Sequence, residues 1–176
     1  MDRGPALGLE SKTVRLVPYD ARWPELYAAE AERITRVLSD RGLALQLEHT
    51  GSTAIPGPSA KPILDILAGR DADSDRAALI TALESAGYTY RGESGIPGRD
   101  FFRRGDPRSY HVHLTERGSQ FWRDHLTFRD RLRRDPDAAR AYAEVKAELA
   151  RRFPMDRERY IEGKTDFVLK ILRRAH

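Results

Sequence analysis

The segment EHTGSTAIPGPSAKPILD spans residues 48–65 and places a glycine–serine turn ahead of a strand that carries an acid. A predicted strand leads into Gly51 and Ser52, and the apolar run that begins at Pro62 contains one acidic residue, Asp65. A flexible turn beside a strand-borne carboxylate can bring backbone N–H groups close to phosphate oxygens, next to a ligand for a metal ion. The segment therefore indicates a site of the polyphosphate type.

The residues on either side of this segment predict a sheet with helices. Residues 43–49 alternate at period two, whereas 62–68 form a nearly continuous apolar run, typical of a central strand covered on both faces. A short edge strand is expected over 14–18, and a helix from Asp20 to Gly42. Ser74 is the expected cap of a second helix, which Gly87 ends, and residues 88–91 form a further strand.

The second half of the chain predicts a hairpin followed by helices. The hairpin pairs 100–104 with 109–114, and helices begin at Ser119, Asp135 and Asp156. The expected fold is α+β, with a mixed sheet of four to five strands flanked by helices, and 117–176 mainly helical. Residues 13–176 are expected to form a single domain behind a mobile N-terminal tail over residues 1–12.

Composition narrows the classes of function. The net charge is +4, with 31 basic and 27 acidic residues that alternate rather than form one-signed runs. This modest excess favours a small anionic ligand, and nucleic acid is not expected as a partner. The chain has no cysteine, which excludes disulfides, thiolate zinc sites and a cysteine nucleophile. It has no apolar run long enough to span a membrane and no secretion signal at its start, so a cytoplasmic protein is expected. The sequence does not indicate an oligomeric state.

The spacing of the turn and the acid matches the nucleotidyltransferase fold in part. In that fold a Gly-Ser turn precedes two carboxylates at i and i+2, which face the same way and hold metal ions for in-line displacement. Gly51, Ser52 and Asp65 fit this pattern, but Leu67 occupies the second acidic position. Ordinary two-metal catalysis is therefore in doubt.

A pair of histidines is the first candidate to complete the metal site. His111 and His113 lie on one face of their strand, because alternate residues point the same way. If that strand neighbours the strand of Asp65, His113 comes to lie beside the carboxylate, and the three residues form a metal site with Asp65 and His113 as catalytic residues. Two histidines and one aspartate favour a transition metal over magnesium. The alternatives are a polar surface pair and a structural ion pair of Asp65; Asp100 and Glu116 are weaker candidates for the missing carboxylate.

Three further residues near the turn have both a functional and a structural interpretation. Lys61 is expected to contact phosphate, or else to be a surface lysine at the start of a strand. His49 is a candidate catalytic base or a core histidine, since it shares a face with leucines. Thr53 either donates a hydrogen bond to phosphate or braces the loop.

The C-terminal third supplies two more candidate anion ligands. Arg129 could pair with an anion bidentately or form an internal salt bridge between helix and sheet. Lys164, four residues after Tyr160 on the expected last helix, either joins the same cluster or takes part in amphipathic packing.

Together these blocks resemble the GrpB family over about residues 14–172. The similar segments are Val17–Asp20 with Trp23 and Tyr27, Glu48–Gly57 with Ala60–Ile66, Tyr110–His113, His125–Leu126 with Phe128–Arg133, Tyr142 with Lys146, and Tyr160 with Lys164 and Phe167. The resemblance implies a nucleotidyltransferase-like fold that occurs alone or fused to dephospho-coenzyme A kinase. The biochemical role of the family is poorly defined, so the resemblance informs the fold more than the function.

Three functions follow as hypotheses. The first is a transferase that moves a nucleotidyl or related phosphate-bearing group onto a small acceptor, with a nucleoside triphosphate as possible donor and a divalent metal, magnesium or manganese. Gly51, Ser52 and Lys61 would hold the phosphates, and Arg129 would neutralise charge. The second is a non-catalytic nucleotide- or anion-binding module that has lost the second carboxylate. The third is a metal-independent biosynthetic group-transfer or ligase-like enzyme on the same scaffold.

Overall fold

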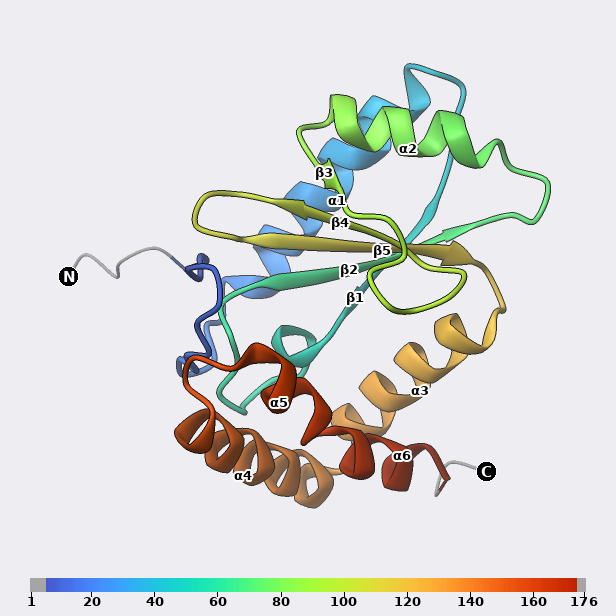
Figure 1. The fold of residues 1–176 in the computed structure, drawn as a ribbon. Coiled ribbons are helices and arrows are strands. Elements are labelled where there is room, and N and C mark those ends of the chain that lie inside the picture. Colours follow the sequence, from blue (N-terminus) through green and yellow to red (C-terminus); the bar gives the residue numbers. More distant parts are fainter. Residues whose placement is uncertain (1–5, 174–176) are drawn as a thin grey trace.

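The computed structural model describes residues 6–173 and shows a five-stranded sheet between two layers of helices (Figure 1). The strand order is β1-β2-β5-β4-β3, in which β2 and β5 pair in parallel and the other neighbours pair antiparallel. The mixed sheet, with its helical C-terminal third, confirms the predicted α+β class. The strands are β1 Gln46–Thr50, β2 Leu64–Arg70, β3 Thr89–Tyr90, β4 Asp100–Arg104 and β5 Tyr110–Glu116.

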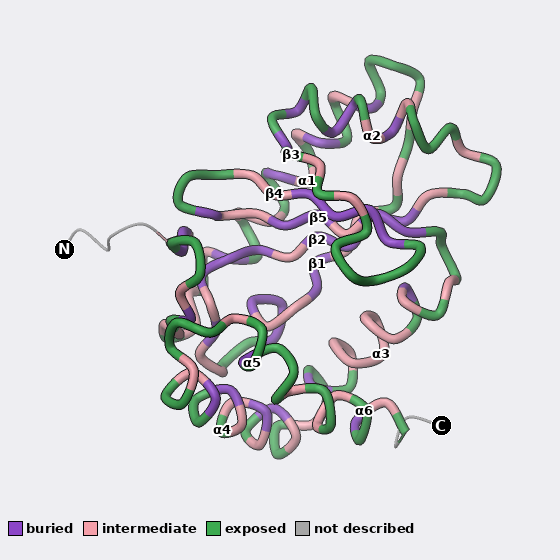
Figure 2. Tube along the Cα trace, viewed as in Figure 1, coloured by how far each residue is buried: buried purple, intermediate pink, exposed green. Residues whose placement is uncertain are grey.

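Helices α1 and α2 cover one face of the sheet, and the C-terminal helices lie on the other side (Figure 1). The main core forms where the two early helices meet the central strands, through Ile34, Leu83, Ile66, Phe102 and Val112. Figure 2 shows this burial along the central strands. The helices are α1 Trp23–Ser39, α2 Arg76–Ser85, α3 Gln120–Arg134, α4 Pro136–Arg152, α5 Arg157–Glu162 and α6 Thr165–Arg173.

Most predicted elements are present, and their caps explain where they begin. The hairpin of β4 and β5 is confirmed, as are the helices that begin after Ser119 and Asp135. The Ser119 hydroxyl accepts a hydrogen bond from Trp122 N at 3.2 Å, and Asp135 accepts one from Ala138 N at 3.0 Å. Both bonds satisfy an N–H group that lacks a partner within the first helical turn.

Three local predictions are wrong. The predicted edge strand over 14–18 is reduced to one bridge between Val17 and Ala60. Helix α2 is capped by Asp75 rather than Ser74. The predicted last helix breaks near Gly163, where a Cβ atom would lie 2.3 Å from Leu149 of α4; the two helices approach too closely there for a side chain.

The N-terminal segment expected as a mobile tail falls partly outside the described residues, which exclude 1–5. Of the remainder, Leu9 is buried and forms a bridge with Arg108, and Ala6 accepts a hydrogen bond from the Trp23 indole at 2.9 Å. Residues 6–9 thus pack onto the domain. Within residues 6–173, no helix is both long enough and apolar enough to cross a membrane.

Candidate functional site

Neighbouring strands place three polar residues in one row across the sheet. Thr50 of β1 is paired with Asp65 of β2, and Asp65 is paired with His111 of β5. Residues paired in this way project from the same face. His113, two residues further along β5, projects from that face as well. The strand of the two histidines is therefore the neighbour of the Asp65 strand, which was the condition for His113 to lie beside the carboxylate.

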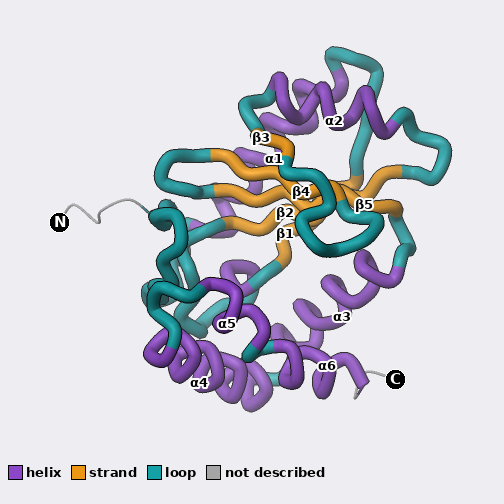
Figure 3. The backbone as a smooth tube through the Cα atoms, viewed as in Figure 1, coloured by secondary structure: helices purple, strands orange, loops and turns teal. Residues whose placement is uncertain are grey.

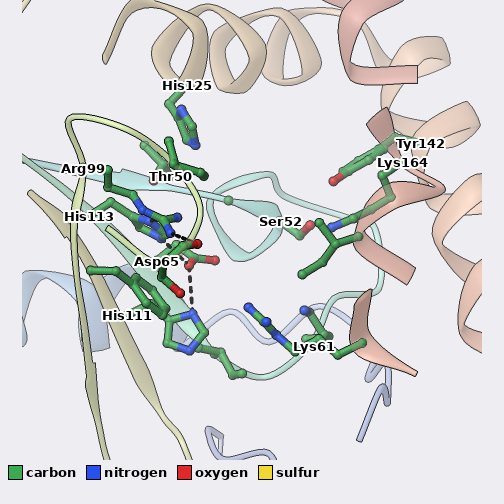
Figure 4. Close-up of a pocket in the computed structure, with 17 residues that line it drawn as sticks. Thr50, Ser52, Lys61, Asp65, Arg99, His111, His113, His125, Tyr142 and Lys164 are labelled. Carbon is green, nitrogen blue, oxygen red and sulfur yellow. Dashed lines mark hydrogen bonds and ion pairs between the residues drawn. The ribbon is translucent and has the colours of Figure 1, made fainter. Parts of the chain in front are cut away.

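Asp65 accepts hydrogen bonds from both histidines (Figure 4). Its Oδ1 atom lies 3.0 Å from His113 Nε2 and 3.3 Å from His111 Nδ1. Burial alone would raise the pKa of Asp65, but the two histidines outweigh it and hold the pKa well below its ordinary value. Burial lowers the pKa of both histidines despite the neighbouring carboxylate. Near neutral pH the cluster is thus an ionised carboxylate beside two neutral imidazoles.

The turn at Gly51 closes tightly over this carboxylate. Gly51 has φ = +71°, and a Cβ atom built on it would lie 2.5 Å from Asp65 Oδ2. Only glycine tolerates both the backbone conformation and the short distance. Ser52 follows in the short 3₁₀ turn Ser52–Ala54, so the predicted glycine–serine turn does reach Asp65.

The turn, the sheet and the helical third enclose a cavity of about 420 Å³. Figure 3 shows the segments 51–63 and 91–99 that border it, and Figure 4 shows Asp65 and His113 on one side with Tyr142 and Lys164 on the other. The lining residues are Thr50, Gly51, Ser52, Lys61, Ile63, Asp65, Ser94, Ile96, Arg99, Phe101, His111, His113, His125, Tyr142, Arg157, Ile161 and Lys164.

Positive charge dominates the cavity. Asp65 is the only acid that lines it among the described residues, against the cations Lys61, Arg99, Arg157 and Lys164. The ammonium groups of Lys61 and Lys164 lie 5.1 and 4.7 Å from the centre of the same Tyr160 ring. Burial, and then repulsion from Lys164, lower the pKa of Lys61 to about 7. An anion beside these groups would relieve the repulsion between them.

Three predicted site residues lie outside the cavity lining. His49 stacks on Tyr27 at 4.8 Å, and its Nε2 lies 2.9 Å from the Thr53 hydroxyl. Arg129 donates hydrogen bonds to Glu48 at 2.8 Å and to the carbonyl of His49 at 3.1 Å. These contacts match the structural interpretation given for each residue, because they support the end of β1 and the start of the turn.

The candidates for a second carboxylate are not in the cavity either. Asp100 is buried against Arg76 and Tyr90 on the side of α2, and Glu116 is exposed near Arg70. Leu67 is fully buried and does not line the cavity. Asp65 is thus the sole carboxylate available to the site within residues 6–173.

Sequence reasoning did not assign His125, Arg99 or Arg157 to the site, although His125 is part of a segment that resembles the family. The Nδ1–H group of His125 donates to the Phe121 carbonyl at 2.8 Å, which leaves Nε2 as an acceptor, and burial lowers its pKa to about 4. His125 is one of only five histidines, so its rarity was a usable signal. No such signal marked Arg99 or Arg157 among 31 basic residues.

Fold and site define an α+β protein with a cationic cavity built around one carboxylate and two histidines. The chain belongs to the GrpB family, because the family model described as GrpB protein matches residues 13–174. It is 44% identical over 167 residues to a UPF0157 protein of Pseudomonas aeruginosa, covering 92% of this chain and 67% of that protein. The crystal structure of conserved protein GrpB from Enterococcus faecalis matches with a TM-score of 0.81 and 34% identity, covering 92% and 96% of the two chains.

A third relative is longer than this chain. The protein named dephospho-CoA kinase in Mycolicibacterium paratuberculosis is 30% identical over an alignment of 190 residues. The alignment covers 92% of this chain and 46% of that protein. The chain thus spans less than half of that relative.

Proposed function

We propose that the cavity binds a phosphate-bearing donor, such as a nucleoside triphosphate, and transfers a nucleotidyl or related group to a small acceptor. The observation that carries this proposal is the meeting of the Gly51–Ser52 turn, Asp65 with its two histidines, and Lys61 with Lys164 in one cavity. Backbone N–H groups and ammonium groups are the usual ligands of phosphate oxygens. The relative named dephospho-CoA kinase is consistent with a nucleotide-related role.

We further propose a divalent metal at Asp65, His111 and His113. The three candidate ligand atoms lie within 4.8 Å of one another, and the separations of 3.0 and 3.3 Å from Oδ1 suit neighbouring ligands of one ion. Two imidazoles favour a transition metal over magnesium, which prefers oxygen ligands. Such a metal would supply Lewis acidity at a phosphoryl oxygen.

The residues of the cavity would have different roles in such a reaction. Lys61 and Lys164 would hold phosphate oxygens and neutralise charge, while Gly51 allows the backbone to approach. His125, with Nε2 held as an acceptor by the carbonyl of Phe121, would orient a donor group of the acceptor molecule. Arg129 is removed from the phosphate-binding set, because Glu48 and Asp130 already occupy its guanidinium.

The cavity has no second carboxylate within residues 6–173, which favours an alternative, a module that binds the anion without turnover. Leu67 is buried on β2, the same strand as Asp65, and its cross-strand neighbour Glu48 forms an ion pair with Arg129. Binding and turnover must therefore be measured separately.

Calorimetric titration with Mn²⁺, Mg²⁺ and each of ATP, CTP and GTP tests the proposal. We expect Mn²⁺ to bind, and Asp65→Asn to weaken it at least about tenfold, since an amide removes the charge without changing the shape. The matched control Asp137→Asn removes an exposed acid on α4 and should leave affinity unchanged. No heat with any pair of metal and nucleotide would contradict the proposal.

Phosphorus NMR of the same mixtures separates the two functions. New phosphorus resonances in the presence of a small acceptor indicate transfer, whereas binding without any new resonance indicates the module. Turnover that survives chelation of metals would instead support the metal-independent enzyme.

A further inference from the structure

The row of paired residues that carries Asp65 continues past His111. In the pairing of β4 with β5, Arg103 lies directly opposite His111 and projects from the same face. Two strand spacings, about 10 Å, separate its backbone from that of Asp65. The next residue, Arg104, points to the other face, where it contacts Glu30 at 2.6 Å. The sheet thus presents an arginine beside the acid–histidine cluster.

Arg103 has no acid to balance its charge within the described part of the chain. It forms no ion pair there, and its Nε atom is buried without an acceptor. Burial, and then the neighbouring Arg157, Arg108 and Arg91, lower the pKa of Arg103 to about 10. A desolvated guanidinium among like charges is costly unless an anion joins it.

Two hollows meet at this side chain. One has a volume of about 430 Å³ and the other about 190 Å³, and Arg103 and Arg108 line both. Arg157 lines the larger hollow and also the cavity that contains Asp65, so the two spaces adjoin at this residue. The Nε atom of Arg157 is likewise buried without an acceptor.

The acids that line the hollows are Asp156 and Glu158 in the larger one and Asp106 in the smaller one, and Glu10 lies close to Arg108. Asp156 caps α5 through a hydrogen bond from Arg159 N at 3.1 Å and lies 3.6 Å from the Arg159 guanidinium. Arg108 donates to the carbonyls of Leu9 and Glu10 at 3.2 and 2.7 Å, which holds its guanidinium in place. None of these acids forms an ion pair with Arg103 within the described residues.

We propose that Arg103, Arg108 and Arg157 form a second anion subsite, which binds a further phosphate group of the ligand held in the Asp65 cavity. The identity of that ligand rests on the proposed function, while the subsite itself stands on Arg103 and Arg157, whose Nε atoms are buried without an acceptor, and on the hollows that adjoin at Arg157. Planar guanidinium groups suit phosphate oxygens because they donate two parallel hydrogen bonds. The subsite therefore selects ligands with several phosphates over those with one.

Calorimetric titration with inorganic tripolyphosphate and orthophosphate tests the subsite. We expect Arg103→Gln to weaken tripolyphosphate binding about tenfold and to change orthophosphate binding less than about twofold. Arg103→Lys keeps the charge but loses the paired donors, and should show an intermediate loss. Arg140→Gln removes one exposed positive charge on α4 and should leave both affinities unchanged. Circular dichroism of each variant checks that the fold is retained.

The outcomes separate the subsite from the proposed function. Tripolyphosphate binding that is insensitive to Arg103→Gln would overturn the subsite and leave the Asp65 cavity as it stands. Orthophosphate binding that survives Lys61→Met would count against the proposed function, and an Arg103-dependent loss of tripolyphosphate would still support the subsite. Wild-type protein that binds neither anion would overturn both.

Discussion

At the scale of single residues, the site depends on side chains whose charge is controlled by burial and by close neighbours. Asp65 stays ionised because two imidazoles donate hydrogen bonds to it. Burial and the neighbouring Lys164 lower the pKa of Lys61 to about 7. Such shifted groups within a cavity mark a functional site more strongly than a surface ion pair does. Two predictions follow from these residues.

Replacement of Gly51 by alanine should disrupt the carboxylate directly. The new Cβ atom would lie 2.5 Å from Asp65 Oδ2, at φ = +71°, so either the turn or the acid must move. We expect a loss of about 1–3 kcal/mol in the free energy of unfolding, measured by urea denaturation, and weaker Mn²⁺ binding. Gly57→Ala is the matched control, since its φ is +102° but its Cβ would meet nothing within 4 Å. Equal metal affinity in the two variants would argue against the close contact.

The charge of Lys61 should make anion binding depend on pH. With its pKa lowered to about 7, Lys61 is cationic below that pH and neutral above it, so affinity should fall as pH rises through about 7. Sulfate is the probe, because its own charge is constant in this range. Lys61→Met should remove the pH dependence in a titration series from about pH 6 to about pH 8. A wild-type affinity that stays flat across this range would contradict the prediction.

At the scale of elements, sequence signals of short range performed well. The caps Ser119 and Asp135, the hairpin of β4 and β5, and the buried strand β2 all appear where local patterns predict them. The break between α5 and α6 was missed; it falls at Gly163, where the close approach of Leu149 leaves no room for a side chain. The contribution of a helix cap to stability can be measured without changing a residue of the cavity.

Removal of the Asp135 cap should destabilise α4 without touching the cavity. Asp135→Ala loses the acceptor for Ala138 N, and we expect a loss of about 1 kcal/mol in the free energy of unfolding. Asp137→Ala, on an exposed position of the same helix, should change it by less than about 0.5 kcal/mol. Urea denaturation of both variants provides the measurement, and a loss at Asp135 no larger than that at Asp137 would contradict the prediction.

At the scale of the whole molecule, the site exists only because the helical third packs against the sheet. Tyr142, Arg157 and Lys164 complete a cavity whose other side is Asp65 and its histidines. Arg129 ties α3 to β1 through Glu48, and Lys146 of α4 donates to the Ser59 carbonyl at 2.7 Å. These contacts join the C-terminal helices to the β1 strand and to the loop that precedes β2.

The two tryptophans should report one unfolding transition. Trp23 lies on α1 and Trp122 on α3, on either side of the sheet, and both are buried. The variants Trp23→Phe and Trp122→Phe each retain one tryptophan as a fluorescent reporter. If the chain unfolds as a single domain, the denaturation midpoint measured by fluorescence should equal the midpoint measured by circular dichroism for the same variant. Midpoints that differ between the two probes of either variant would divide the chain into two folding units.

Local patterns along the chain were enough to predict the fold class, most element boundaries, the turn at Gly51 and the shared face of His111 and His113, because each depends on residues close in sequence. The order of strands was not readable in this way, and it is this order that sets β5 beside β2 and brings the histidines to Asp65. The folded chain was likewise needed to show that Arg129 pairs with Glu48 and that Arg99 and Arg157 line the cavity. Partners distant in sequence are chosen by packing, and neither periodicity nor spacing records which of many arginines will meet which acid.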